Sequence, residues 1–264
     1  MPGDSSRPTA VVSGSATGIG AACARHLAAA GLNVAVNYTK SVAEAEATAE
    51  ACRALGVEAL VVQGDVAEDA DCRALVAAAL EAWGGLDVLV NNAGTTRFAD
   101  AGDLESLAKD DFDRIFAVNV IGAYQLTRAA APHLKAAGGG GGGAVGNLSS
   151  HSGFSGIGSS IAYAASKGAL NTLTLSLARA LAPEVRVNAV CPGFVDTRWM
   201  AGKLNQAEMA EFRARAAEIA PLKLLVTPDQ VAEAVCWFAL GGRAVTGQLL
   251  VIDGGTHLTV AKPV

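Results

Sequence analysis

The sequence predicts an α/β fold in which helices cover both faces of one doubly wound parallel sheet. Short β-branched runs alternate with longer, alanine-rich amphipathic runs along the 264 residues, which is the pattern of repeated strand–helix–strand units. Hydrophobic residues make up 51% of the chain and charged residues only 17%, as expected where strands are covered on both faces. This length suits one core, so we expect a single domain over residues 1–264.

The first strand and helix show how each element is predicted. The run TAVVSG (9–14) is apolar and β-branched, and the helix after it has Ile19, Cys23 and Leu27 on one face and Gly31 as its stop signal. The same patterns predict further strands at NVAVNY (33–38), EALVVQGDV (58–66), LDVLVNNAG (86–94), AVGNLSS (144–150), VRVNAVCPG (185–193) and GQLLVIDGG (247–255), and further helices at 43–55, 69–83 and around 112–131. About seven parallel strands with right-handed crossovers give a Rossmann-type sheet.

Two stretches interrupt this alternation. The six glycines of Gly138–Gly143 are interpreted as a flexible surface connection rather than a phosphate loop, because no helix start follows them. Residues 194–226 form a long insertion that we expect to cover a site, with an amphipathic stretch at 206–219. Its large apolar side chains are Trp199, Met200 and Phe212.

The helix after this insertion has a clear start signal. Thr227 and Gln230 have the spacing of a capping box, and Pro228 stands at the first helical position. We therefore expect the helix to begin at TPDQ.

Composition argues against several classes of partner. The net charge of -5 gives no electrostatic case for nucleic acid or an anionic membrane. The five cysteines and four histidines show no metal-ligand spacing, so no metal is expected. The sequence lacks both the apolar core of a secretory signal and an apolar run of the ~18 residues that a membrane span needs. We therefore expect a cytoplasmic protein without a membrane segment.

The turn SGSATGIG joins the first strand to the first helix. Gly14, Gly18 and Gly20 follow the spacing GxxxGxG, which lets the chain turn tightly and offers free N–H groups to a pyrophosphate at a helix N-terminus. The alternative is a turn whose glycines serve packing alone. The position between an apolar strand and a helix favours a dinucleotide site.

The end of the second strand bears on the choice of cofactor. An acidic residue there would bind the 2′-hydroxyl of NAD, but the strand ends in Asn37 and Tyr38, followed by Thr39, Lys40 and Ser41. This favours NADP(H), with NAD(H) possible. After the third strand, Asp65 could accept a hydrogen bond from the adenine amino group or serve as an ordinary helix N-cap.

Tyr163 and Lys167 are the candidates for acid–base chemistry. Their spacing places them on one face of a helix, where an ammonium group would lower the phenol pKa toward the working range. Ser150, at the end of the fifth strand, could hydrogen-bond a substrate oxygen. A single pair at this spacing is common in helices, but the glycine turn and Ser150 together favour reduction of a ketone by a nicotinamide cofactor.

These motifs together resemble the short-chain dehydrogenase/reductase family over residues 9–257. SGSATGIG is similar to its TGxxxGxG, NNAG (91–94) to its NNAG, YAASK to its YxxxK, and PGFVDT to its PGxxxT. The resemblance implies a catalytic tetrad of Asn119, Ser150, Tyr163 and Lys167, in which Asn119 holds a relay water and Lys167 also binds the nicotinamide ribose. It implies cofactor contacts from Gly14, Ser15, Thr17, Gly18, Ile19, Asn37, Tyr38, Thr39, Asp65, Val66, Asn92, Ala93, Gly94, Tyr163, Lys167, Pro192, Gly193, Val195 and Thr197. It also implies a homotetramer.

The resemblance is strongest to the 3-oxoacyl-[acyl-carrier-protein] reductases, which use a 3-oxoacyl thioester. An acidic carrier protein would meet few basic residues here, chiefly His133 and Lys135, with Arg128 and Arg179 elsewhere. We therefore expect a ketone or secondary alcohol as substrate, with Trp199, Met200, His151 and Phe154 as candidates for the substrate wall. The alternatives are an NAD-dependent alcohol or sugar dehydrogenase, a cofactor-binding sensor without turnover, and an adenosyl-cofactor methyltransferase, which would not require YxxxK.

Overall fold

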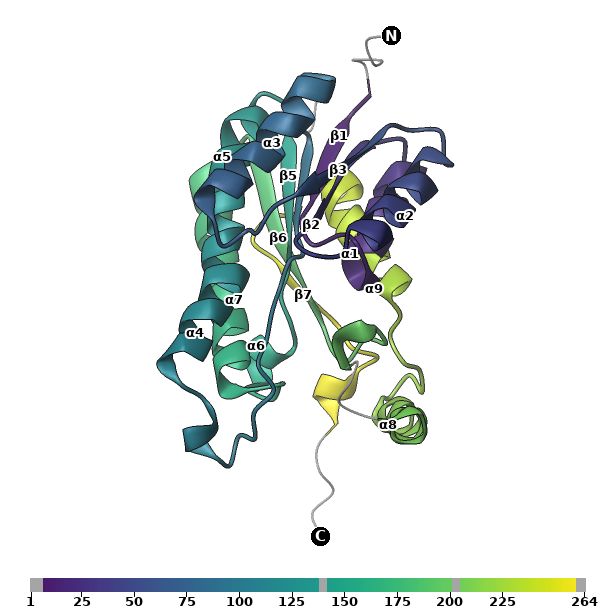
Figure 1. Ribbon diagram of the computed structural model, residues 1–264, viewed down its shortest axis with the longest axis vertical. Helices are drawn as coiled ribbons and strands as arrows, with labels where there is room; N and C mark the ends of the chain where they lie inside the picture. The colour runs from purple at the N-terminus through teal and green to yellow at the C-terminus, as the bar shows by residue number, and fades with distance from the viewer. Residues whose placement is uncertain (1–6, 138–141, 201–204, 260–264) are drawn as a thin grey trace.

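A computed structural model of the chain describes residues 7–137, 142–200 and 205–259, apart from the side chain of Met200 (Figure 1). All seven strands pair in parallel, in the spatial order β3-β2-β1-β4-β5-β6-β7. Their bounds are β1 Thr9–Val12, β2 Asn33–Tyr38, β3 Ala59–Gln63, β4 Val88–Asn91, β5 Gly143–Leu148, β6 Val185–Pro192 and β7 Leu249–Ile252. The predicted doubly wound sheet is confirmed.

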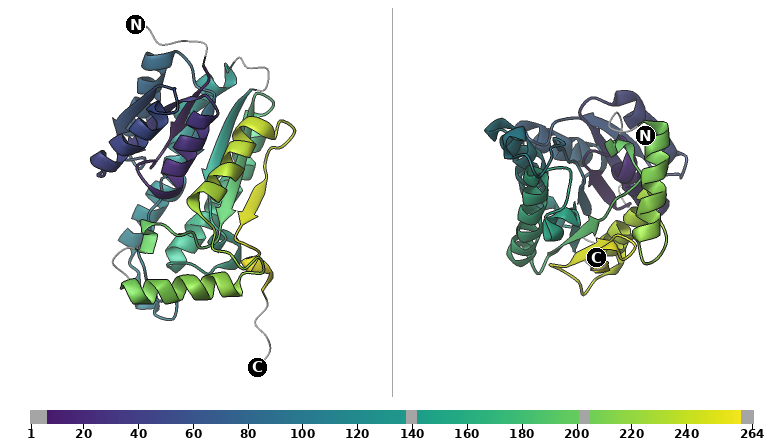
Figure 2. Two further views of the ribbon diagram at one scale, coloured as in Figure 1. Left: turned by 90° about the vertical axis from the view of Figure 1, so that its right-hand side faces the viewer. Right: turned by 90° about the horizontal axis from the view of Figure 1, so that it is seen from below.

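The helices lie in two layers on the two faces of the sheet (Figures 1 and 2). α1 packs against α2 and α9 on one face, and α3 packs against α5 on the other. The bounds are α1 Gly18–Ala29, α2 Val42–Arg53, α3 Asp69–Trp83, α4 Lys109–Phe116, α5 Ala123–Lys135, α6 Ser152–Ser155, α7 Ile161–Leu181, α8 Gln206–Ile219 and α9 Pro228–Cys236. Single-turn 3₁₀ segments occur at η1 Leu104–Ser106, η3 Arg198–Met200 and η5 Thr256–Leu258, and π-helical segments at η2 Ala117–Gly122 and η4 Trp237–Gly241.

The central strands explain why the apolar runs are continuous. In β1, Ala10 and Val12 belong to the core beneath α1 and α9, whereas Val11 belongs to the core beneath α3 and α5. Val88 and Val90 of β4 alternate with Leu89 in the same way. A strand covered on both faces therefore needs apolar residues at every position, as the sequence shows.

The predicted helix around 112–131 is divided in the structure. A π-helical segment, η2, separates α4 from α5 and contains Asn119. At Gly122 the π segment lies close to the loop that follows β3. A Cβ added there would lie 2.8 Å from the Val66 carbonyl oxygen. Such π segments widen a helix by one residue, which the spacing of apolar residues does not reveal.

The insertion carries α8, which lies across the carboxyl end of the sheet (Figure 2). Residues 206–219 are helical, as predicted from their amphipathic pattern, and each residue of α8 is at least partly exposed. Of the glycine run, Gly143 begins β5 and Gly142 precedes it, while Gly138–Gly141 lie outside the described residues. The part of the chain that is described contains no helix with the length and apolar character needed to cross a membrane.

The start of α9 is the predicted capping box. The Thr227 hydroxyl oxygen accepts from the Gln230 N–H at 3.3 Å, and the Gln230 side-chain oxygen accepts from the Thr227 N–H at 3.0 Å. Thr227→Ala removes the first of these bonds and should lower the free energy of unfolding by about 1 kcal/mol. Urea denaturation of the two proteins measures the difference. An unchanged midpoint would show that the packing of α9 alone fixes this boundary.

Candidate active site

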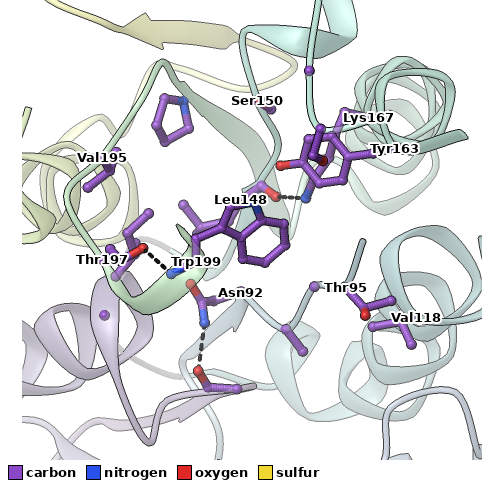
Figure 3. Close-up of a pocket in the computed structure, with 18 of the residues that line it drawn as sticks. Asn92, Thr95, Val118, Leu148, Ser150, Tyr163, Lys167, Val195, Thr197 and Trp199 are labelled. Atoms are coloured by element: carbon purple, nitrogen blue, oxygen red, sulfur yellow. Dashed lines mark hydrogen bonds between the residues drawn. The ribbon is translucent and has the colours of Figure 1, made fainter. Parts of the chain in front are cut away.

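A cavity of about 1300 Å³ opens at the carboxyl ends of the central strands (Figure 3). Its walls come from the segments that follow β1, β2, β3, β4, β5 and β6. The cavity lies where the connections leave β1 and β4 in opposite directions, which is the usual ligand site of a doubly wound sheet. The cavity thus lies where the sequence predicts a dinucleotide site.

The glycine turn forms one wall of the cavity. Gly14 and Gly18 have φ angles of 60° and 59°, which favour glycine. The Asn92 amide donates to the carbonyl oxygens of Ser13 and Gly14 at 3.0 and 2.8 Å, and a Cβ at Gly20 would lie 2.3 Å from that amide nitrogen. These close contacts hold the turn open toward the N-terminus of α1, so the cradle fits a pyrophosphate.

Two of the expected contact residues support this turn from behind. The Ser15 side chain is fully buried; its hydroxyl donates to the Val12 carbonyl at 2.6 Å and accepts from the Asn37 N–H at 3.0 Å. The Asn37 amide is also occupied, because its oxygen accepts from Gly14 N–H and its nitrogen donates to the Val62 and Gly64 carbonyls. Both residues fix the loop; Asn37 also lines the cavity, and its expected contact with the cofactor stays a prediction.

After Asn37, some residues at the end of β2 pack against the core and others line the cavity. The Tyr38 ring is half-buried against the core beneath α1 and α9, so it supports the wall rather than lining it. Thr39 and Lys40 line the cavity. They are the residues of this segment that can face a 2′-substituent.

Asp65 lies in the cavity wall beside a cation that the sequence did not single out. Its carboxylate accepts from Arg114 at 2.7 Å and from the Ala67 N–H at 3.0 Å. The net effect of these bonds, and of the charge on Lys40, is a lowered pKa for Asp65, although burial opposes it. The N-cap of α3 is Glu68, so Asp65 is not the N-cap of this helix in the described structure.

Ser150, Tyr163 and Lys167 meet at the inner end of the cavity (Figure 3). Ser150 follows β5, and Tyr163 and Lys167 lie on α7, whose N-cap Ser160 accepts from the Tyr163 N–H at 3.2 Å. The Lys167 ammonium donates to the Leu148 carbonyl at 2.7 Å and lies 5.6 Å from the centre of the Tyr163 ring. The predicted grouping of hydroxyl, phenol and amine is thus present in the structure.

The pKa values of this group depend mainly on burial. Burial raises the pKa of Tyr163 to about 12, although a hydrogen bond with Ser150 opposes the rise. Burial also lowers the pKa of Lys167 to about 8. We expected Lys167 to lower the Tyr163 pKa. In the protein without a bound cofactor, burial raises this pKa instead.

Asn119 lies behind this group rather than in the cavity wall. Its side-chain amide nitrogen donates to the Thr95 carbonyl and to the Ser166 hydroxyl, both at 3.0 Å, and its oxygen accepts from the Thr95 N–H at 2.8 Å. Ser166 in turn donates to the Tyr163 carbonyl at 2.7 Å. Because both amide protons are used, only the oxygen acceptors of Asn119 remain for the expected water.

The other expected cofactor residues line the cavity. A Cβ at Gly193 would lie 2.6 Å from the Asp253 side chain, and one at Gly18 would lie 3.4 Å from the Thr197 methyl group. The segment after β6 therefore passes close to both the C-terminal strand and the glycine turn. The members of this set are Gly14, Thr17, Gly18, Ile19, Thr39, Asp65, Val66, Asn92, Ala93, Gly94, Pro192, Gly193, Val195 and Thr197.

The expected substrate wall is only partly correct. Trp199 packs its ring 5.7 Å from that of Tyr163, and His151 also lines the cavity. Phe154, in α6, is not among the residues that line the cavity, and 53% of its surface is exposed. The side chain of Met200 lies outside the described residues.

Several lining residues escaped sequence analysis. Examples are Thr95 and Phe98 after β4, Ile157 and Ser159 before α7, and Arg198 in η3. Their common feature is a place in a loop that follows the carboxyl end of a strand. That position was readable, but the direction of each side chain was not.

Comparison with known proteins gives a consistent result. A family model described as enoyl-(acyl carrier protein) reductase matches residues 14–257. A protein of *Streptomyces violaceoruber*, provisionally named ketoacyl reductase 2 of the granaticin polyketide synthase, is 44% identical over 95% of this chain and 96% of its own length.

Solved structures agree with these sequence matches. A protein from Burkholderia xenovorans, provisionally assigned as a short-chain dehydrogenase/reductase, is 42% identical with a TM-score of 0.89, covering 96% of this chain and 99% of its own. A short chain dehydrogenase from Burkholderia cenocepacia, solved in complex with NADP, is 37% identical with a TM-score of 0.82, covering 95% and 98%. The expected homotetramer stays a prediction, because a single chain does not test it.

The lowered pKa of Lys167 predicts a pH-dependent stability. Between pH 8 and the ordinary lysine value of 10.5, the unfolded chain keeps a proton that the folded protein has released. The free energy of unfolding should therefore rise with pH by about 1 kcal/mol per unit in this window, relative to Lys167→Met. Urea denaturation of both proteins from pH 7 to about pH 10 measures this. A constant difference between them would mean that Lys167 keeps an ordinary pKa.

Proposed function

The chain belongs to the short-chain dehydrogenase/reductase family, and we propose that it interconverts a ketone and a secondary alcohol with NADP(H) as cofactor. The observation that carries this proposal is the meeting of Ser150, Tyr163 and Lys167 at the inner end of a cavity whose outer wall is a glycine cradle. The members of this family are oxidoreductases that use NAD(P). The three side chains supply what a carbonyl reduction needs from the protein.

In the proposed reaction, each group has one task. The Ser150 and Tyr163 hydroxyls hold the carbonyl oxygen of the ketone, and the bound nicotinamide supplies a hydride to its carbon. The Tyr163 O–H bond breaks, and its proton goes to the oxygen to give the alcohol. With a pKa of about 12, Tyr163 carries this proton at neutral pH and can donate it.

The return of the proton to Tyr163 is assigned to Lys167. Its amine is buried, and with a pKa of about 8 it can gain and lose a proton near neutral pH. It contacts the Leu148 carbonyl and lies against the Tyr163 ring. A cationic Lys167 also favours the phenolate, which the reverse oxidation requires.

The charges around the outer cavity favour NADP(H) over NAD(H). Lys40 and Arg114 carry two positive charges there, and Asp65 carries one negative charge that Arg114 already pairs with. Lys40 thus remains as a cation for a 2′-phosphate. The NADP complex of the relative from Burkholderia cenocepacia supports this choice.

A 3-oxoacyl thioester is the second candidate substrate. The 44% identity to a protein named as a ketoacyl reductase favours it. A sensor that binds the cofactor without turnover is disfavoured, because such a protein would not need Ser150, Tyr163 and Lys167 together.

Tyr163→Phe tests the catalytic proposal. Removal of the hydroxyl should lower kcat by about 10²- to 10⁴-fold and leave the NADPH dissociation constant within about twofold, because the ring and the cradle remain. NADPH oxidation with a panel of ketones and a 3-oxoacyl thioester gives the rate, and NADPH fluorescence gives the affinity. Tyr124→Phe, at an exposed phenol on α5, is the matched control. Surviving turnover in Tyr163→Phe would remove Tyr163 from the mechanism.

Lys40→Ala tests the cofactor preference. Loss of a charged partner for the 2′-phosphate should weaken NADPH binding by about tenfold. NADH binding should change by less than about twofold, since NADH lacks that phosphate. Fluorescence titration with both cofactors measures the two affinities, and Lys109→Ala on the exposed face of α4 is the control. An equal loss of affinity for NADPH and NADH would show that Lys40 does not contact the 2′-phosphate.

A further inference from the structure

A second cavity of about 690 Å³ lies beneath α8 and adjoins the catalytic cavity. The two cavities share His151, Ile157, Gly193, Phe194 and Phe212, so they lie side by side. We call the second one the α8 chamber. Its remaining walls are Glu208, Glu211, Arg215, Ala216, Ile219, Leu224, Leu225, Val226, Asp253 and Thr256.

The middle of the α8 chamber is apolar and begins with two aromatic rings. Phe194 and Phe212 meet edge to face, with their ring centres 4.7 Å apart, at the junction of the two cavities. Leu224, Leu225 and Val226 follow along the wall. A ligand that enters here from the catalytic cavity must therefore present apolar surface, and rings suit the faces of the two phenyl groups.

The packing of α8 shows that its apolar side chains lack cover. Phe212 is 37% exposed and Ile219 is 54% exposed, although both line the α8 chamber. The helix is attached by the contact of Phe212 with Phe194 and by the ion pair of Arg213 with Asp196 at 2.8 Å, and a capping box at Asn205 fixes its start. An amphipathic helix normally buries its apolar stripe, so an apolar ligand would supply the missing contact.

Charge at the rim restricts the ligand further. Glu208, Glu211 and Asp253 line the chamber with three negative charges against the single positive charge of Arg215. A carboxylate on the ligand would meet this excess of negative charge. The ligand body is therefore not anionic.

We propose that the α8 chamber binds the body of the substrate, and that this body is apolar, free of anionic groups and made of several fused rings. The inference rests on the proposed function, which places the ketone carbon beside Tyr163. A volume of about 690 Å³ lies within the range of about 300 to 1000 Å³ that encloses drug-sized ligands. A compact ketone would leave the α8 chamber unfilled and gain nothing from it.

A ketone series with matched variants tests this proposal. Cyclohexanone, α-tetralone and a tetrahydrophenanthrenone add one fused ring at each step, and kcat/KM should rise along the series. Ala216→Phe fills the α8 chamber, whereas Ala214→Phe makes the same change at an exposed position of the same helix. The preference is kcat/KM for the tetrahydrophenanthrenone divided by kcat/KM for cyclohexanone. We expect Ala216→Phe to lower this ratio by about tenfold. Ala214→Phe should keep this ratio within about twofold.

A binding measurement separates this proposal from the proposed function. Equilibrium dialysis of the tetrahydrophenanthrenone with the NADPH complex of Tyr163→Phe should show binding that Ala216→Phe weakens. Such binding without any turnover in the unsubstituted protein would support the α8 chamber and overturn the proposed reduction. Turnover with an unchanged ratio in Ala216→Phe would overturn the α8 chamber alone. Preference for a linear 3-oxoacyl thioester over all ring ketones would also overturn it. Phe212→Leu, which removes one ring at the junction, replaces Ala216→Phe if that variant does not fold.

Discussion

The site depends on the clamp that two asparagines place on the glycine turn. Asn37, at the end of β2, accepts from the Gly14 N–H, and Asn92, after β4, donates to the Gly14 carbonyl. These two strands flank β1 in the sheet, so the parallel order alone brings both side chains to the turn. Without this clamp the turn could not keep its backbone N–H groups directed at a ligand, because glycine resists no rotation by itself.

Much of the fold was readable because each strand and helix carries its own local signal. β1, β2 and α3 follow runs whose period and end residues agree with the structure. The position of the site was readable for the same reason, since the carboxyl ends of parallel strands meet at one edge. Tyr163 and Lys167 could be paired because helix spacing fixes their common face.

Side-chain roles were less readable where two tasks compete for one residue. Asn37 was expected to contact the cofactor and does line the cavity, but the sequence did not indicate that its amide also bonds to Gly14, Val62 and Gly64. Burial likewise reverses the expected pKa shift of Tyr163, and its extent depends on the whole cavity rather than on the neighbouring lysine. Asn119, in the π segment, bonds to Thr95 and Ser166, which are distant in the sequence, so local spacing could not reveal these contacts.

The inner end of the catalytic cavity and the α8 chamber differ in how firmly their walls are held. This difference would separate the proposed chemistry from the choice of substrate. The inner end is built from rigid elements, α7 and the end of β5, and its polar groups are held by short hydrogen bonds. α8 instead is attached by one ion pair and by the contact of Phe212 with Phe194, and its apolar side chains are partly exposed. Changes in α8 can therefore alter which substrate body fits without moving the atoms that transfer the proton. In the proposed function, selectivity for the substrate body thus falls to α8, which has no buried residue, and proton transfer to the buried side chains of Tyr163 and Lys167.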